Sequence, residues 1–226
     1  PALAGLVVSG VLLLWPGMRQ FTVLPGSQLR IVPVTLFYGL LTFGATVVGL
    51  EFWRGVRTRR RTMGEGSLAA LRALIAHNRR RYGGYLIHVG VIFIALGVIG
   101  TNFFKVETQR NLARDESFTI DSPFTGTYTV TYTGLSTLQA PADVRRTGAT
   151  LMVLQDGRPI DLLQPTHDFY IPQGQPMTIP AMRHTLAEDL YVILAGWEEG
   201  GSSATFKVFV EPLVNWLWIG GIVFIF

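Results

Sequence analysis

Long apolar runs without charge dominate the chain up to Phe104, and charged or glycine- and proline-containing segments separate them. A run of about 20 such residues is long enough to cross the ~30 Å hydrocarbon layer of a bilayer as a helix. The pattern predicts the end of a transmembrane helix over 1–15, transmembrane helices over 31–53 and 82–104, and the start of another over 212–226. We therefore expect a multi-span α-helical membrane protein, of which this chain is a piece.

The segment 54–81 separates two of these predicted helices and is strongly basic. It contains nine arginines and one glutamate. Loops rich in arginine stay on the cytoplasmic side of a membrane, so we expect a basic cytoplasmic loop here. Ser67 is placed to cap a short amphipathic helix that runs to Asn78 within this loop. Contact with anionic lipid would also suit the arginines, and neither explanation requires nucleic acid.

Strict alternation of apolar and polar residues begins after the predicted helix and marks residues 105–211 as an all-β domain. In the segment 127–133, Tyr128, Val130 and Tyr132 share one face. Asp156-Gly157 lies between two alternating runs and predicts a hairpin turn. A second pair is predicted between 190–195 and 205–210. We expect five or six short strands, on the periplasmic side because the arginines hold the preceding loop inside.

Composition agrees with a membrane protein that carries an extramembrane domain, since 49% of the 226 residues are hydrophobic and only 15% are charged. The absence of cysteine excludes a disulfide framework, a thiolate metal site and cysteine catalysis within this chain. The net charge of +4 averages a basic loop and an acidic β domain. It is therefore no sign of a nucleic-acid partner. Nucleotide-binding and hydrolase motifs are also absent from the sequence.

His88 is the only histidine or charged residue between Arg81 and Phe104. It lies about seven residues, or roughly 10 Å of helix rise, from the arginine end. An imidazole in lipid needs a partner because uncompensated polar groups there are costly. One explanation is axial ligation of haem iron by a ring nitrogen. The other is a hydrogen bond to a neighbouring helix. One histidine supplies a single axial ligand, so any second ligand lies outside this chain.

Small residues surround His88 on the predicted helix. On a helix, one face carries Gly84, His88, Ile92, Ala95 and Ile99. Gly84 and Ala95 would leave room beside the imidazole for a flat, bulky ligand. A separate stripe, at heptad spacing, consists of Gly83, Gly90 and Gly97. This stripe should admit a neighbouring helix, since small residues allow close packing in lipid.

The other histidines carry weaker signals. His77 is expected at the basic surface, and His167 and His184 are expected in exposed loops of the β domain. The spacing of His167 and His184 matches no metal motif. The arginines 79–81 are explained by topology, with haem propionates as an alternative partner. Trp197 begins an exposed loop that could meet a partner.

Five blocks of the sequence resemble one known family. The segment NRRRYGGYLIHVGVIFIALGVIG resembles a late membrane span of the CcmF family, the haem lyase subunit of bacterial cytochrome c biogenesis. The other similar blocks are EFWRGVRTRRR, QPTHDFYIPQGQPMTIPAM, EDLYVIL and EPLVNWLWIGG. The resemblance thus covers nearly the whole chain. It implies a multi-pass protein of the bacterial inner membrane with its β domain in the periplasm.

The resemblance also implies chemistry. The family takes haem from a haem chaperone and joins it to the C-x-x-C-H thiols of apocytochrome c, together with other cytochrome c maturation membrane subunits. Its members hold haem b in the membrane between two histidines, and the motif around one of these matches Tyr82 to His88. The role of axial ligand therefore carries to His88 only, with Gly84 beside the haem. The family's tryptophan-rich segment and its two periplasmic histidines are absent from this sequence, so no catalytic residue is assigned and the piece alone should be inactive.

Two other functions stay open on the sequence. A membrane b-type cytochrome that acts only in electron transfer would use His88 in the same way, without haem attachment. A non-enzymatic scaffold module would use His88 only to bond a neighbouring helix, and its β domain to dock a partner. The resemblance favours the haem lyase over both.

Overall fold

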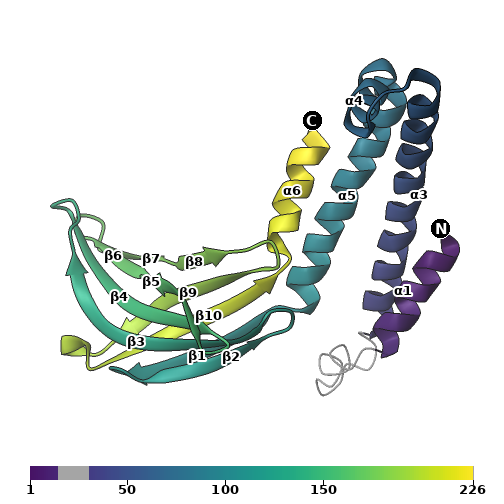
Figure 1. Cartoon of the computed structure of the whole chain (residues 1–226). Helices are drawn as coiled ribbons and strands as arrows, with labels where there is room; N and C mark the ends of the chain where they lie inside the picture. The colour runs from purple at the N-terminus through teal and green to yellow at the C-terminus, as the bar shows by residue number, and fades with distance from the viewer. Residues whose placement is uncertain (15–30, 226) are drawn as a thin grey trace. The chain divides into compact units, whose positions relative to one another are not determined.

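The computed structural model describes residues 1–14 and 31–225, which form two compact units. The first unit is helical and comprises residues 1–103 and 216–226, and the second comprises residues 104–215. The described helices of the chain are α1 (Ala2–Leu14), α3 (Ile31–Met63), α4 (Ser67–His77), α5 (Arg79–Phe103) and α6 (Val214–Ile225). Figure 1 shows α1, α3, α5 and α6 as neighbouring rods. The described residues do not include 15–30 or 226. Residue 15 of the first predicted helix and residue 226 of the last one therefore lie outside them.

Glycines set the spacing between the helices of the first unit. A Cβ atom added at Gly5 of α1 would come within 2.8 Å of the Gly39 carbonyl oxygen of α3. A Cβ at Gly44 of α3 would lie 3.6 Å from Ile92 of α5. Side chains at Gly5 would therefore push α1 and α3 apart. Gly39 of α3 thus allows the close approach of α1.

The predicted glycine stripe of α5 receives α6. A Cβ atom at Gly90 would lie 2.9 Å from the Gly220 carbonyl oxygen, and one at Gly97 would lie 2.6 Å from the Leu217 nitrogen. The stripe is thereby confirmed at these two positions. Gly83 takes no part, because no described atom lies within 4 Å of a Cβ there. One face of α5 is thus closed by backbone contact with α6.

The basic segment is more helical than predicted. Helix α3 continues ten residues past Trp53 to Met63, where a loop was expected. The arginines of this stretch favour helix, and the helix ends only at Gly64, whose φ of +70° suits glycine. The predicted cap is also wrong, because Gly66 occupies the N-cap of α4 and Ser67 is its first helical residue.

The second unit contains ten described strands in two sheets. They are β1 (Val106–Ala113), β2 (Ser117–Ser122), β3 (Gly126–Leu138), β4 (Val144–Gln155), β5 (Arg158–Leu163), β6 (Thr166–Tyr170), β7 (Gln175–Ile179), β8 (Ala181–His184), β9 (Glu188–Trp197) and β10 (Ser203–Pro212). One sheet has the order β1-β10-β9-β8, and the other has the order β2-β3-β4-β6-β7 with β5 paired to β4. The expected five or six strands were too few, since short strands such as β7 and β8 lack a clear alternation.

A single apolar core holds the two sheets together as a sandwich. Tyr128, Val130 and Tyr132 of β3 are buried there, against Phe206 and Val208 of β10. The predicted face of β3 is thus confirmed. The two predicted hairpins are confirmed as well, since β4 pairs with β5 and β9 with β10 in antiparallel fashion. The turn residues of the first hairpin, Asp156 and Gly157, have φ angles of 48° and 78°, as its tight turn requires.

One ion pair joins two adjacent inner strands of the six-stranded sheet. Arg146 of β4 donates two hydrogen bonds to Asp168 of β6, at 2.7 and 2.6 Å. Asp168 is buried, and the guanidinium lowers the pKa of its carboxyl from the ordinary value of 3.8. The two strands are adjacent, with Arg146 directly opposite Asp168. The pair therefore fastens β6 to the centre of its sheet.

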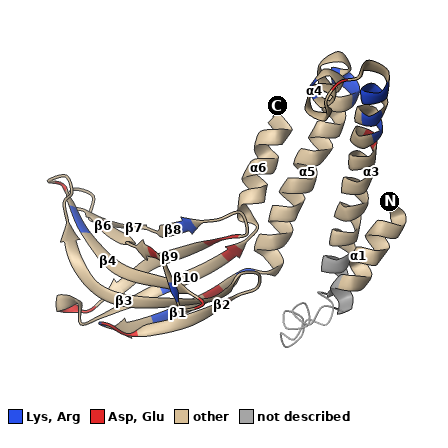
Figure 2. Ribbon diagram, viewed as in Figure 1, with Lys and Arg blue, Asp and Glu red and all other residues tan. Residues whose placement is uncertain are grey.

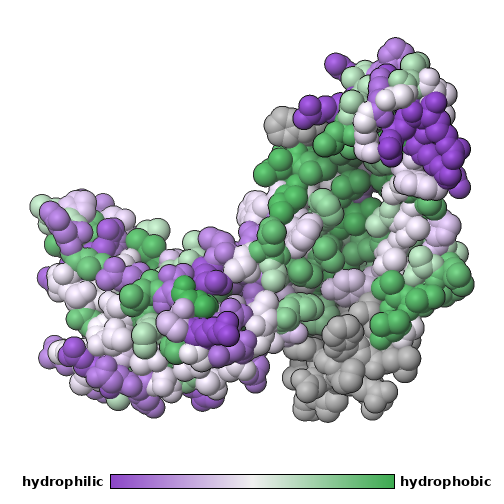
Figure 3. Space-filling view, in the orientation of Figure 1, coloured by the Kyte–Doolittle hydropathy of each residue, from purple (hydrophilic) through white to green (hydrophobic). Residues whose placement is uncertain are grey.

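Charge and hydropathy divide the helical unit along its length. Arginines gather where α3 ends and α4 packs on it (Figure 2), and the helix shafts away from that end are mostly hydrophobic at the surface (Figure 3). The stretches Leu36–Met63 and Arg79–Phe103 are long and apolar enough to cross a membrane, by length and composition. This is the distribution expected of helices whose ends lie in water.

We predict that Gly97→Ile separates α5 from α6. The added side chain would meet the backbone of Leu217, and overpacking of this kind costs about 1–3 kcal/mol. The measurement is the thermal unfolding temperature of the detergent-solubilised protein. Gly83→Ile is the matched control, because a side chain there meets open space. Equal unfolding temperatures for the two variants would contradict the packing described.

A second prediction concerns acid stability. The pKa of the Asp168 carboxyl is lower in the folded than in the unfolded state, so its ionisation stabilises the fold. This contribution to the free energy of unfolding is fully present above the unfolded pKa of about 4 and is lost as pH falls through the folded pKa. Urea-denaturation midpoints of the β domain, measured from about pH 7 down to about pH 3, should fall more steeply for the wild type than for Asp168→Asn. A constant difference between the two proteins across this range would refute the assignment.

Candidate functional site

His88 lies on α5 with its side chain exposed. Its Nδ1 is 2.7 Å from the carbonyl oxygen of Gly84, one turn earlier in the helix. A carbonyl oxygen only accepts hydrogen bonds, so Nδ1 carries the hydrogen in the neutral ring. The lone pair is then on Nε2. The helix itself thus sets the tautomer and leaves Nε2 as the nitrogen that can coordinate a metal.

The surroundings of His88 are open and apolar. No described atom lies within 4 Å of a Cβ atom added at Gly84. Ile87 and Val91, beside His88 in the helix, are 45% and 48% exposed. Val98, further along α5, is also exposed. This side of α5 therefore offers an imidazole within an apolar surface, while Gly90 and Gly97 are covered by α6.

A polar and aromatic cluster lies within the two helical turns before His88. Glu51 of α3 accepts hydrogen bonds from Arg81 at 2.7 Å and from Tyr85 at 3.4 Å. The ring of Phe52 contacts the rings of Tyr82 and Tyr85, with centroids 5.5 and 6.1 Å apart. The cluster ties α3 to the start of α5. No local sequence pattern reveals this cluster, because Glu51 and Arg81 are 30 residues apart.

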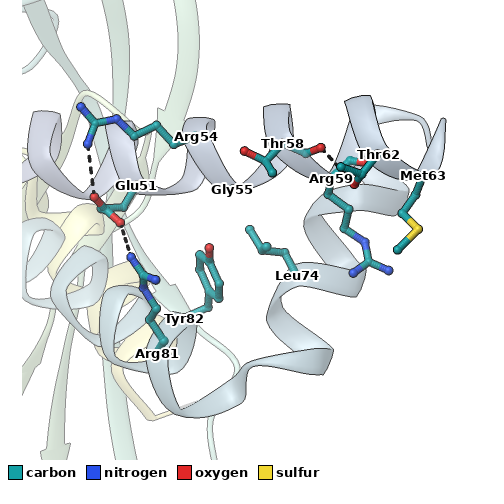
Figure 4. Close-up of a pocket in the computed structure, with 10 residues that line it drawn as sticks. All are labelled: Glu51, Arg54, Gly55, Thr58, Arg59, Thr62, Met63, Leu74, Arg81 and Tyr82. Atoms are coloured by element: carbon teal, nitrogen blue, oxygen red, sulfur yellow. Dashed lines mark hydrogen bonds and ion pairs between the residues drawn. The ribbon is translucent and has the colours of Figure 1, made fainter.

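The same end of the helices contains a cleft of about 550 Å³ between α3, α4 and α5. We call this the basic cleft. Figure 4 shows its lining, which consists of Glu51, Arg54, Gly55, Thr58, Arg59, Thr62, Met63, Leu74, Arg81 and Tyr82. Tyr82 and Leu74 point toward Gly55, and a Cβ atom at Gly55 would lie 2.6 Å from each side chain. Glycine at this position therefore lets the three helices close around the cleft.

The other histidines have separate surroundings. His77 is exposed at the end of α4. The ring of His167 packs edge-on against Trp197, with centroids 5.1 Å apart, whereas His184 contacts the Asp189 carboxylate at 2.7 Å through Nδ1. The part of the chain that the structure describes contains no group of three or more histidine, aspartate or glutamate residues placed to hold a metal ion.

Two buried carboxylates of the β domain were not anticipated. Glu188 accepts hydrogen bonds from the hydroxyls of Ser122, Thr125 and Tyr128. Burial raises the pKa of Tyr128 to about 12, so this hydroxyl stays protonated and donates. Asp189 accepts from Asn215 at 2.6 Å, at the start of α6. These carboxylates serve the fold, because internal donors occupy them.

Comparison with known proteins places the β domain in a described family. Residues 103–212 match the family described as the CcmF C-terminal beta-sandwich. This range covers all ten described strands of the second unit.

Curated relatives extend the similarity beyond the β domain. The cytochrome c-type biogenesis protein CcmF of Pseudomonas aeruginosa is 30% identical over 72% of this chain and 23% of its own length. The probable cytochrome c-type biogenesis protein NrfE of Escherichia coli is 26% identical over 84% of this chain and 33% of its own length. The chain thus spans 23% to 33% of the length of these relatives.

A solved structure shows a similar fold. The protein titled Cytochrome c Heme Lyase CcmF matches 98% of this chain and 32% of its own chain, with a TM-score of 0.70 and 20% sequence identity. Helices and sandwich are both included in this match, so the fold of the whole chain has a counterpart.

Proposed function

We propose that this chain, which belongs to the CcmF family of cytochrome c-type biogenesis proteins, is part of a membrane haem lyase in which His88 is one axial ligand of a b-type haem. The observation that carries the proposal is the position of His88. Its imidazole lies exposed on an apolar helix face, with Nδ1 bonded to the Gly84 carbonyl and the lone pair on Nε2.

The chain's residues fit such a group. Haem iron binds a neutral imidazole through one nitrogen, and the second nitrogen usually donates to a carbonyl that fixes the ring and raises its basicity. Gly84 supplies that carbonyl and, having no side chain, leaves space beside the ring. Ile87 and Val91 supply apolar contact area on the same side. Bound haem would provide one-electron chemistry, and the chain's residues would hold it and exclude water.

The remainder of the proposed lyase lies outside this chain. The second axial ligand and the groups that hold substrate haem would come from other parts of the longer protein, since the chain spans only part of its relatives. That protein would take haem from a haem chaperone and join it to apocytochrome c thiols. The β sandwich would present a surface to these partners or to other maturation subunits.

A membrane location is part of the proposal. Two described helices are long and apolar enough to cross a bilayer, and arginines gather at one end of them. By the positive-inside rule, that end would be cytoplasmic and the β domain, at the other end of α5, would be periplasmic. The bacterial inner membrane satisfies this arrangement.

Replacement of His88 tests the ligand. In the purified full-length protein, His88→Ala should lower the affinity for haem by more than the ~10–100-fold that follows loss of a ligand's supporting partner, and haem occupancy should fall with it. The Soret and α bands report the occupancy, and added imidazole should restore them in part. His77→Ala is the matched control, since His77 is exposed on another helix. Unchanged bands in His88→Ala would refute the ligation.

A maturation assay separates a lyase from an electron carrier. In cells that lack the full-length gene, the wild-type protein and His77→Ala should restore covalent haem in c-type cytochromes, whereas His88→Ala should not. Haem-stained gels measure the product. If cells that lack the full-length gene already make c-type cytochromes with covalent haem at the wild-type level, the chain belongs to an electron carrier and the lyase role is wrong.

A further inference from the structure

We infer that the basic cleft binds the phosphate headgroup of an anionic phospholipid. The inference concerns a site separate from His88. The cluster formed by Glu51, Arg81 and Tyr85 lies between this site and His88 along α5. It rests on the proposed function only in requiring that α3 and α5 lie in a membrane.

The cleft has the size of a binding site. Its volume of about 550 Å³ lies within the range of small-molecule pockets. Three helices form its walls, with Gly55 on α3, Leu74 on α4 and Tyr82 on α5. Leu74 and Met63 give it an apolar side. If the arginines served only to set the membrane topology, they would not need to lie around a common cleft. Here residues from three helices line the same cleft.

The charge of the lining is positive. Arg54, Arg59 and Arg81 face the cleft, and Glu51 is the one acidic residue of the lining. A neighbouring hollow, of about 390 Å³, adds Arg57, Arg60 and Arg61 against a single acid, Glu65. The two hollows share the end of α3. An anion near this end is therefore attracted by an excess of arginine from both sides.

Two arginines of the cleft, Arg54 and Arg81, keep donors for a ligand. Arg59 instead donates two hydrogen bonds to Glu65. Glu51 takes one hydrogen bond from Arg81 and an ion pair from Arg54 at 3.6 Å. The two arginine side chains are nonetheless 55% and 67% exposed. Each guanidinium carries five N–H donors, in a geometry that suits phosphate oxygens. Glu51 thus orients both side chains without exhausting them.

The surface beside the cleft selects lipid over a soluble phosphate compound. Exposed apolar side chains follow the same helices away from it, among them Leu36, Phe37, Leu40 and Phe43 of α3. In Figure 3 this hydrophobic surface meets the hydrophilic end of the helical unit. Trp53, with Arg57 stacked 4.9 Å from its ring centre, marks the boundary as tryptophan does at membrane interfaces. A phosphate in the cleft would thus place acyl chains along the apolar helices.

The test is lipid retention by the full-length protein in detergent, measured by native mass spectrometry. Phosphatidylglycerol should be retained in preference to phosphatidylcholine. The double variant Arg54→Gln/Arg81→Gln should lose about fivefold in phosphatidylglycerol retention for each arginine. Arg79→Gln/Arg80→Gln is the matched control, because it removes the same charge from residues next to the cleft that do not line it. This control should retain the lipid.

A second variant fills the cleft without changing its charge. Thr58 lines the cleft from an exposed position on α3, and Thr58→Phe should reduce retention as well while leaving the haem bands unchanged. Haem absorbance and lipid retention are read on the same preparation, so failure of the haem proposal is distinguishable from failure of this one. Equal retention of both lipids, or equal loss in the two arginine pairs, would overturn the inference. Displacement of phosphatidylglycerol by millimolar inorganic phosphate would assign the cleft to soluble phosphate and would also overturn it.

Discussion

The hydrogen bond between His88 Nδ1 and the Gly84 carbonyl is the interaction on which this account depends. A polar ring on an apolar helix surface is costly unless its nitrogens find partners. The helix satisfies one nitrogen from its own backbone and thereby decides which nitrogen faces outward. The residue that supplies the carbonyl is Gly84, which has no side chain and therefore leaves space beside the imidazole. A ligand can then approach the ring from that side.

Helix α5 can serve this purpose because its contacts are distributed around it. Gly90 and Gly97 bring α6 into backbone contact, and the Glu51 cluster fixes the arginine end against α3. The side that carries His88 stays open and apolar. Close packing on one side thus holds the helix in place, so that the open side can present the imidazole in a defined orientation. The basic cleft occupies the same helices at their polar end.

Local patterns predicted much of this structure, and long-range contacts account for what they missed. Alternation identified the core face of β3, and Asp156-Gly157 identified a hairpin, because both signals lie within a few residues. Charge alone does not predict that α3 continues to Met63, because a basic segment between two apolar runs also fits a loop. Arginine nevertheless favours helix. Glu51 with Arg81, and Glu188 with its three hydroxyls, involve residues far apart in sequence, and no local pattern reveals such pairs. His88 could be predicted as a candidate site residue because a single imidazole within an apolar run is visible in a short stretch of sequence.

A density map of the intact full-length protein, purified with its bound cofactor, would test the central claim most directly. The account predicts a porphyrin against the exposed face of α5, with iron bonded to Nε2 of His88 while Nδ1 keeps its bond to the Gly84 carbonyl. Density that shows only lipid or neighbouring side chains around that ring, with the haem bound elsewhere, would contradict it.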